Sequence, residues 1–214
     1  MSFTITSQQY VSYLHTVAAR LRESKDYVTS LDAATGDGDH WANLMTGFDA
    51  IEAECPALES MPLSSVFQKI GMLMMSKVGG SSGILYGGAY MAVAKGLKGK
   101  ESFSASELCE ALGLMVQDMM KRGQAEPGYK TMIDALYPAW KTMEKRLAEG
   151  REDTALLEEV KAASLAGAEA TRGMEAVKGR ASYRTDKGVG FLDAGAVTMS
   201  YQIACLCDTI KAGL

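Results

Sequence analysis

The chain has 214 residues and a formal net charge of −4, with no long run of basic residues. This balance argues against a nucleic-acid binder held by phosphate contacts and leaves small molecules and proteins as the expected partners. The length suits one substantial hydrophobic core, and no long Pro/Ser-rich linker interrupts it, so we expect residues 1–214 to form a single domain.

The sequence shows neither a targeting segment nor a membrane span. Residues 1–6 lack a basic stretch followed by an apolar one, so no secretory signal is predicted. The longest apolar stretch, Gly83–Val93, is too short and too rich in glycine to cross a bilayer, and we expect a soluble, cytoplasmic protein without membrane contact. The cysteines match neither a disulfide framework nor a zinc knuckle. Buried free thiols are therefore expected at Cys55, Cys109, Cys205 and Cys207.

Helical periodicity dominates from the first residues onward. In the first helix, apolar residues recur in steps of three and four from Tyr10 to Leu21, and Thr6 with Gln9 forms a capping-box pattern. Strand-like alternation is nearly absent, so the fold class predicted is all-α, an antiparallel up-and-down bundle of about eight helices joined by short links. The further helices are expected at 41–54, 63–77, 83–97, 105–122, 131–148, 153–174 and 194–211. The 14 methionines, among them the cluster of Met72, Met74 and Met75, are expected to fill gaps in the core.

One helix junction carries an unusual concentration of acidic residues. Asp32, Asp37 and Asp39 surround two glycines immediately before the helix expected from residue 41. Carboxylates this close repel one another, and Mg²⁺, which prefers oxygen ligands, offsets that repulsion. The free N–H groups at the start of the following helix favour a phosphate beside the metal. The alternative is an ordinary surface turn with a capping Asp, because Asp-Gly pairs are common in turns.

Known loop motifs do not explain this segment. Counted from Asp32 as an EF-hand, the loop has Ala34 and Gly36 at ligand positions and Asn43 where the bidentate Glu belongs. A dinucleotide-binding fingerprint fails as well, because Trp41 occupies the third glycine position and no strand precedes it.

Other helix junctions also carry residues that could belong to a ligand site. Gly79–Gly83 offers small residues, hydroxyls and exposed amides, although no P-loop lysine follows and a plain hinge remains an alternative. The 123–132 and 178–183 segments can each bring a cation to a phosphate. In the second segment the cation is Arg180, whose planar guanidinium can bind two phosphate oxygens; the alternative is that Arg180 is a solvated surface residue. Asp193 before the last helix is explained equally by capping. Of the two histidines, His40 adjoins the carboxylates and is expected to contact a nucleotide, whereas His15 is expected to pack within the first helix.

Taken together, these motifs resemble the L subunit of dihydroxyacetone kinase, its nucleotide-binding subunit. The resemblance rests on four motifs in the family's order and covers nearly the whole chain. They are Gly36-Asp37-Gly38-Asp39-His40 with Asn43, Gly79-Gly80-Ser81-Ser82-Gly83, Ala125-Glu126-Pro127-Gly128 with Lys130-Thr131-Met132, and Gly179-Arg180-Ala181-Ser182-Tyr183.

The resemblance implies a barrel of eight antiparallel helices with ADP or ATP at one end. Two Mg²⁺ ions would lie between the nucleotide phosphates and Asp32, Asp37 and Asp39, which with Arg180 would form the catalytic group. Trp41 and Met132 would flank the adenine. The nucleotide site implied is His40, Trp41, Ala42, Asn43, Ser81, Ser82, Gly123, Met132, Arg180, Asp193, Ala194 and Gly195.

Two residues depart from the family pattern. Tyr129 stands where the family usually has Asp, which puts the hydrogen bonding around Lys130 and Thr131 in doubt. Ala194 replaces the usual proline before the final helix, which would loosen a turn facing the nucleotide.

The resemblance also implies partners and an activity. A K subunit would hold dihydroxyacetone, and the L subunit would transfer a phosphoryl group to it from its own nucleotide. A short chain without a fused K domain looks like the form whose bound ADP is recharged by a phosphotransferase-system M subunit. The alternatives are a subunit that exchanges ATP, with a related ketose or tetrulose as acceptor, and a non-catalytic nucleotide-sensing regulator.

Overall fold

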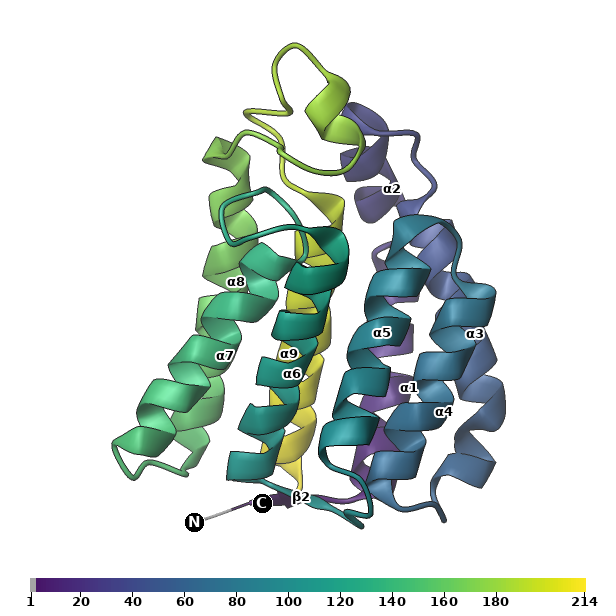
Figure 1. Ribbon diagram of the computed structural model, residues 1–214, viewed down its shortest axis with the longest axis vertical. Helices are drawn as coiled ribbons and strands as arrows, with labels where there is room; N and C mark the ends of the chain where they lie inside the picture. Colours follow the sequence, from purple (N-terminus) through teal and green to yellow (C-terminus); the bar gives the residue numbers. More distant parts are fainter. Residues whose placement is uncertain (1–2) are drawn as a thin grey trace.

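Nine α-helices and two very short strands make up the part of the chain that the computed structural model describes, residues 3–214. The helices run up and down along one direction, with both termini at one end of the molecule (Figure 1). Their bounds are α1 Ser7–Glu23, α2 Lys25–Thr35, α3 His40–Leu58, α4 Leu63–Lys77, α5 Gly80–Gly96, α6 Ala105–Gly123, α7 Ile133–Ala148, α8 Thr154–Ala170 and α9 Ala194–Ala212. The two strands are β1 Thr4–Ile5 and β2 Phe103–Ser104.

The long helices form a closed ring. Contacts link α1 to α3 and then each helix to the next from α3 through α9, and α9 returns to α1. Neighbours in the ring run antiparallel (Figure 1), as expected where the links are short, and the longer loop from α8 to α9 keeps the same order. The prediction of an all-α antiparallel barrel is therefore confirmed.

The shortest α-helix, α2, is an addition to the predicted set of about eight helices. It packs on α3 and α9 at one end of the ring, beside the loop between α8 and α9 (Figure 1). Its one buried residue is Val28, so it has no apolar stripe for a periodicity argument to detect. The helix predicted over 153–174 is also corrected, because α8 ends at Ala170 and the chain tightens into a 3₁₀ turn, η1 Thr171–Gly173.

Local signals explain where the best-defined helices begin. The Thr6 hydroxyl accepts from the amide of Gln9, and the Gln9 side chain accepts from the amide of Thr6, which completes the predicted capping box of α1. Ser104 and Glu107 do the same for α6. At this end of the barrel, β1 pairs antiparallel with β2 through Ile5 and Phe103, which ties the N-terminus to the start of α6.

The apolar faces of the helices meet inside the ring in one cluster of buried side chains. All four cysteines are buried and free, as predicted. Met74 is buried, but the prediction was wrong for Met72 and Met75, which are 55% and 44% exposed on the outer side of α4. Among residues 3–214, no helix is long and apolar enough to span a bilayer.

Candidate nucleotide and metal site

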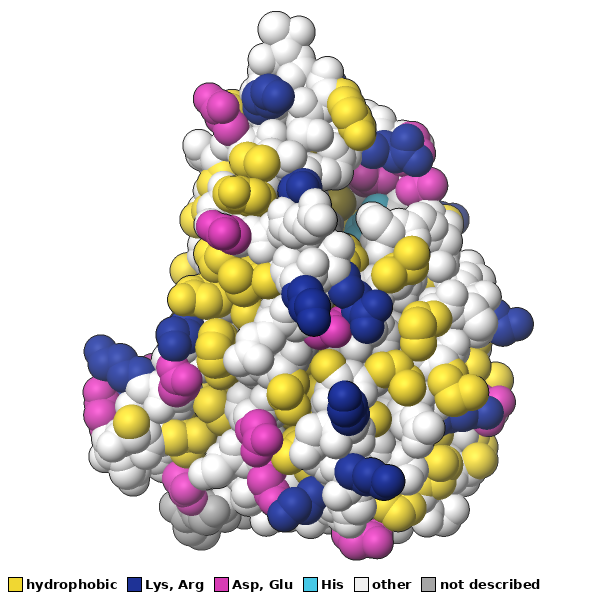
Figure 2. All heavy atoms as spheres, viewed as in Figure 1, with side chains coloured by type: hydrophobic (Ala, Val, Ile, Leu, Met, Phe, Trp, Pro, Cys, Tyr) yellow, Lys and Arg dark blue, Asp and Glu magenta, His cyan; other side chains and the backbone are white. Residues whose placement is uncertain are grey.

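The end of the barrel opposite the termini contains a cleft of about 470 Å³. The helices α3, α5, α7 and α9 all begin there, because every second helix of an up-and-down ring points the same way, and their first residues line it. Helix N-termini carry free N–H groups and partial positive charge, so four of them around one cleft favour an anion. Figure 2 shows charged side chains of both signs gathered at the edge of this hollow.

Most of the residues predicted from the sequence line this cleft. Segments far apart in the chain, from α2 to the start of α9, meet there, although no local pattern required it. The predicted residues in the lining are Asp32, Asp37, Asp39, His40, Asn43, Ser81, Ser82, Gly123, Met132, Arg180, Asp193, Ala194 and Gly195.

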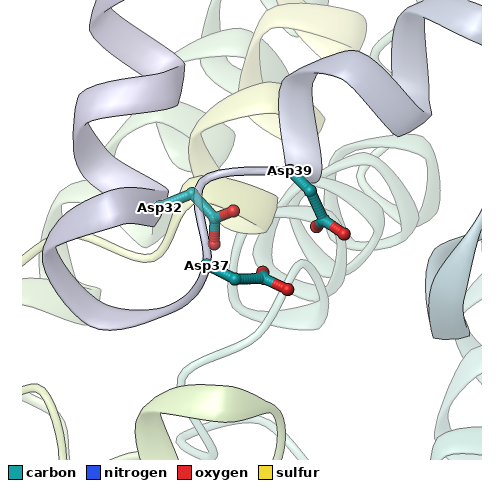
Figure 3. A group of neighbouring side chains, drawn as sticks. All are labelled: Asp32, Asp37 and Asp39. Carbon is teal, nitrogen blue, oxygen red and sulfur yellow. The ribbon is translucent and has the colours of Figure 1, made fainter.

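The three carboxylates of Asp32, Asp37 and Asp39 turn toward one another (Figure 3). One oxygen from each lies within 4.8 Å of the other two. Asp39 precedes α3 directly, yet its side chain makes no capping hydrogen bond, so the capping alternative does not explain it. Asp32 accepts a hydrogen bond from the amide of His40 at 3.0 Å, which joins α2 to the start of α3. Three partly exposed carboxylates with oxygen ligands only are the donor set that fits Mg²⁺.

The two glycines between these aspartates have different roles. Gly38 has a φ of 77°, in the left-handed region that disfavours other residues. At Gly36 the constraint is space, because a Cβ there would lie 2.7 Å from the Asp32 carboxylate oxygen Oδ1. Both glycines allow the chain to turn tightly enough to bring the three carboxylates together.

Arg180 reaches the carboxylate cluster from the other side of the cleft. It begins the 3₁₀ turn η2 Arg180–Tyr183, and its guanidinium lies 2.5 Å from the Asp37 carboxylate. Its side chain is 64% exposed, so solvent screens this ion pair and it contributes little to folding stability. An exposed arginine next to clustered carboxylates is instead available to an anion that enters the cleft.

His40 is more enclosed than its place at a helix start suggests. Its Nε2 lies 2.9 Å from the Thr198 hydroxyl on α9, so the ring bridges two helices. Burial lowers the pKa of His40, and the nearby carboxylates of Asp32 and Asp39 partly oppose that shift.

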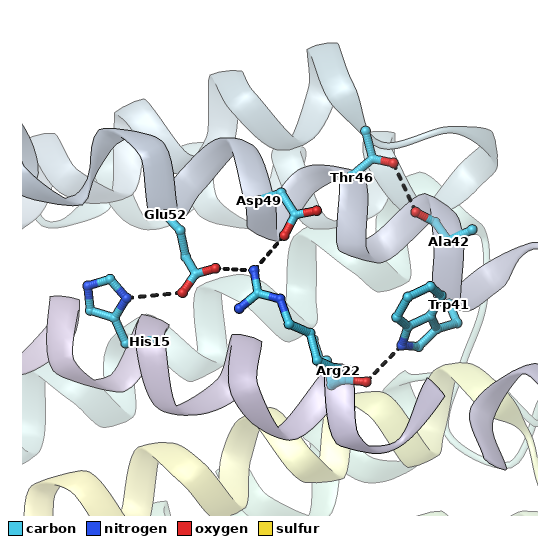
Figure 4. A network of polar contacts seen from close by, with 8 residues as sticks. His15, Arg22, Trp41, Ala42, Thr46, Asp49 and Glu52 are labelled. Atoms are coloured by element: carbon cyan, nitrogen blue, oxygen red, sulfur yellow. Dashed lines mark hydrogen bonds and ion pairs between the residues drawn. The ribbon is translucent and has the colours of Figure 1, made fainter. Parts of the chain in front are cut away.

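Trp41 and Ala42 are the predicted site residues that the structure leaves out of the cleft lining. The Trp41 indole N–H donates to the Leu21 carbonyl at 2.7 Å, so the ring faces α1 (Figure 4). The expectation that Trp41 flanks an adenine therefore has no geometric support here, because successive helical residues point in directions about 100° apart and His40 occupies the inward one.

His15 also differs from its predicted packing role. It is exposed, and its Nδ1 lies 3.0 Å from the Glu52 carboxylate in a polar network that joins α1 to α3 (Figure 4). Arg22 completes this network with Asp49 and Glu52 on the outer surface of the barrel.

The turn before α7 resolves the doubt raised by Tyr129. A carboxylate is present, but it comes from Asp134, which accepts from the amides of Gly128 at 2.5 Å and Thr131 at 2.7 Å. Asp134 was missed as a site residue, although Thr131 to Asp134 has the spacing of a capping box and could have identified it. The turn that presents Lys130 and Thr131 to the cleft is thus held without an acidic residue at 129.

Asp193 caps the start of α9, directly before the alanine that stands where the family usually has proline. Its carboxylate accepts from the amide of Ala196 at 2.7 Å, so the capping alternative holds for this residue, which also lines the cleft. Burial raises the pKa of Asp193 to about 7, with the Ala196 amide and the Lys130 ammonium opposing the shift.

The cleft lining also includes residues that no local pattern predicted. Among them are apolar side chains that suit a flat base, Ile84, Leu85, Met119 and Ile133, and the cationic side chain of Arg122. No local motif marks these residues, because their position depends on how the helix ends pack together. Lys130 and Lys178 also line the cleft, and both lie in segments that were expected to bring a cation to a phosphate.

Comparisons with known proteins agree with this geometry. A family model described as DAK2 domain matches residues 34–208. The ADP-binding subunit of PEP-dependent dihydroxyacetone kinase 1 from Listeria innocua is 34% identical over 92% of this chain and 93% of its own. The ADP-binding subunit of the PTS-dependent dihydroxyacetone kinase from Lactococcus lactis is 33% identical, over 96% of this chain and 99% of its own.

A solved structure has the same fold. The dihydroxyacetone kinase of C. freundii, in complex with AMP-PNP and Mg²⁺, superimposes with a TM-score of 0.72 and 27% sequence identity. The match covers 92% of this chain and 33% of that longer one. The chain therefore belongs to the DAK2 domain family and, within it, to the L subunits of dihydroxyacetone kinase, which confirms the resemblance found in its motifs.

Proposed function

We propose that this chain binds ADP or ATP with magnesium in the cleft and transfers a phosphoryl group from that nucleotide to dihydroxyacetone held by a partner K subunit. The observation that carries the proposal is the group of three carboxylates in a cleft where four helices begin. Carboxylates alone would repel a polyphosphate, whereas carboxylates with a divalent cation and free helix amides bind one. The names of the relatives, which are ADP-binding subunits, support the same ligand.

Each part of the cleft has a role in this proposal. Asp32, Asp37 and Asp39 hold two Mg²⁺ ions, which supply charge neutralisation at the β- and γ-phosphates when bound. Backbone amides at the start of α5, around Ser81 and Ser82, bind phosphate oxygens. Arg180 orients the transferring group, and such arginine contacts contribute about 10³ to 10⁵ in rate in other phosphoryl-transfer enzymes.

The remaining lining suits the nucleoside. Leu85, Met119 and Met132 offer apolar surface to a base, and Gly123 and Gly195 leave room beside them. The start of α9, from Asp193 to Gly195, closes the cleft next to Met132. Catalysis in this arrangement is a matter of positioning and electrostatics rather than of a protein nucleophile.

For the phosphoryl donor, we propose an M subunit of the phosphotransferase system, which recharges ADP that stays bound to the chain. The names of the relatives in Listeria and Lactococcus, which are PEP-dependent and PTS-dependent, favour this donor. The second candidate is a subunit that exchanges ATP and serves dihydroxyacetone or a related ketose or tetrulose. The complex of the C. freundii kinase with an ATP analogue favours that candidate.

The binding half of the proposal is tested by thermal unfolding with and without Mg-ADP. At a nucleotide concentration of about 100 times Kd, binding adds about 2.7 kcal/mol. For a chain of this length that corresponds to a rise in Tm of about 5–10 °C. We expect Asp37→Asn to abolish the shift, and Asp208→Asn, an exposed carboxylate on α9 paired with Lys161, to retain it. An undiminished shift in Asp37→Asn would remove this residue from the metal site.

The transfer half requires partners. The purified chain is mixed with a K subunit, dihydroxyacetone and either ATP or phosphoenolpyruvate with the phosphotransferase proteins. Sugar phosphate formed only with the second donor supports recharging of bound ADP, and formation with ATP alone supports the exchanging kinase. A chain that binds nucleotide and yields no sugar phosphate with either donor would be the regulator. Native mass spectrometry of the isolated chain checks independently for retained ADP and for the number of bound ions.

A further inference from the structure

The loop between α8 and α9, residues 171–193, carries Arg180 and has little helix of its own beyond the turns η1 and η2. It rises above the barrel next to α2 (Figure 1). Its outer part is exposed, and the Tyr183 side chain is 91% exposed. A segment this poor in buried apolar contacts does not hold a side chain in place by packing alone. The position of Arg180 therefore depends on how the loop is anchored.

The anchor of this loop is Lys130. The side chain is 3% exposed, and its ammonium donates to the carbonyl of Thr171 at 2.5 Å and to the carbonyl of Phe191 at 2.6 Å. These two carbonyls lie at the beginning and near the end of the α8–α9 loop. One buried cation thus joins both sides of the loop base to the turn before α7.

Other contacts place the loop against the same turn. The amide of Val177 donates to the carbonyl of Tyr129 at 3.2 Å. Gly188 is buried with a φ of 69°, and a Cβ on it would lie 3.2 Å from the Lys130 Cε, so the loop folds directly over the lysine stem. Lys130 itself has a φ of 62°, an uncommon conformation for a residue with a side chain. The turn accepts this conformation, and the ammonium thereby reaches both sides of the loop.

The charge of Lys130 has no carboxylate partner within hydrogen-bonding distance in the described structure, residues 3–214. Burial lowers the pKa of this ammonium, while the charge of Asp193 opposes the shift. A buried cation bonded to backbone carbonyls costs desolvation energy, and a surface lysine would not incur that cost. The hydrogen bonds to the carbonyls of Thr171 and Phe191 offset part of that cost, and they join two parts of a loop that has few buried apolar contacts.

From these contacts we infer that Lys130 is a positioning residue, which fixes the base of the α8–α9 loop and thereby holds Arg180 over the carboxylate cluster. Removal of the ammonium leaves the Thr171 and Phe191 carbonyls without their buried donor, so the loop opens more often. The inference rests on the proposed function only in that Arg180 contacts the bound nucleotide. Lys130 acts on that contact through the loop.

The first test measures loop opening in the free protein. Lys130→Met keeps the length and apolar stem of the side chain and removes the charge. We expect amide hydrogen exchange at Ala176, Val177 and Gly190, all hydrogen-bonded in or under the loop, to accelerate about 10- to 100-fold. Lys187→Met is the matched control, because it removes an exposed lysine bond to the Ser182 carbonyl within the same loop. Its effect on these amides should stay below about threefold.

The second test is a double-mutant cycle on Mg-ADP affinity with Arg180→Gln. We expect Lys130→Met alone to weaken binding about tenfold, and to change it less than about twofold when Arg180 is already replaced. A lysine that merely stabilised the fold would weaken binding equally in both backgrounds. Equal effects, or unchanged exchange of the loop amides in Lys130→Met, would overturn the inference.

Two further controls separate the possible failures. If Lys130→Met does not fold, Lys130→Gln is measured in its place against the same thresholds, since its shorter amide cannot reach both carbonyls. If the wild-type chain itself does not bind Mg-ADP, the proposed function fails, while the exchange experiment still decides whether Lys130 anchors the loop.

Discussion

The partly buried carboxyl group of Asp193 makes the stability of this protein depend on pH. Its carboxylate caps α9 through the Ala196 amide, and burial raises its pKa to about 7, whereas an unfolded Asp titrates near about 3.9. At pH 5 the folded protein therefore binds a proton that the unfolded chain has released. This protonation stabilises the fold at low pH, and the contribution is lost as the pH rises through 7. Between pH 5 and pH 8 the loss is about 2–3 kcal/mol.

The variant Asp193→Asn isolates this contribution. Asn keeps the shape of the side chain and its capping oxygen but does not ionise. Urea unfolding followed by circular dichroism, from pH 5 to pH 8 in EDTA and without nucleotide, gives the free energy of unfolding of both proteins. We expect the free energy of unfolding of the wild type, minus that of the variant, to fall by about 2–3 kcal/mol from pH 5 to pH 8. The variant is therefore more stable relative to the wild type at high pH than at low pH.

The matched control is Asp153→Asn. Asp153 caps α8 in the same way, through the Leu156 amide at 3.0 Å, but its carboxylate is exposed to solvent. The difference in the free energy of unfolding between the wild type and Asp153→Asn should change by less than about 0.5 kcal/mol from pH 5 to pH 8. A pH-independent difference for Asp193→Asn would refute the reasoning, because the carboxyl group would then have the same pKa in the folded and unfolded chains.

Two substitutions test the turns next to Ala194 and Tyr129, the two residues that depart from the family pattern. Ala194→Pro should raise the free energy of unfolding by about 0.4–1 kcal/mol, because Asp193 is already extended before it and the first helical residue needs no N–H. A fall in Tm would show that the proline side chain does not fit at the start of α9. Asp134→Ala should lower the free energy of unfolding by about 2–4 kcal/mol, since the Gly128 and Thr131 amides lose a buried acceptor. Urea titration checks both variants, and a loss below about 0.5 kcal/mol for Asp134→Ala would contradict the assignment of this carboxylate.

The helices could be predicted because their signals are local. The apolar period from Tyr10 to Leu21 and the capping boxes at Thr6 and Ser104 act within a few residues, so the sequence alone marks these elements. Where the local signal was weak the prediction failed. The helix α2 buries only Val28, and the outer positions Met72 and Met75 looked like core residues until the neighbours of α4 were known.

The candidate site was predictable to the extent that its chemistry is concentrated in short segments. Three aspartates and two glycines between residues 32 and 39 indicate a cation site before any fold is known. The resemblance extended this indication to the other junctions. It did not reveal that Trp41 faces α1 or that Asp134 serves the turn beside Tyr129, because both depend on side-chain directions within the packed barrel.

By itself, then, the sequence determined the helices with strong apolar stripes, the acidic segment and the family, since these depend on neighbouring residues and on residue types. Only the tertiary structure decided which junctions meet. An antiparallel ring brings the starts of α3, α5, α7 and α9 together at one end, so segments as far apart in the chain as Asp32 and Gly195 form one cleft. The role inferred for Lys130 also depends on the tertiary structure, because its two carbonyl partners come within reach only after the barrel has closed.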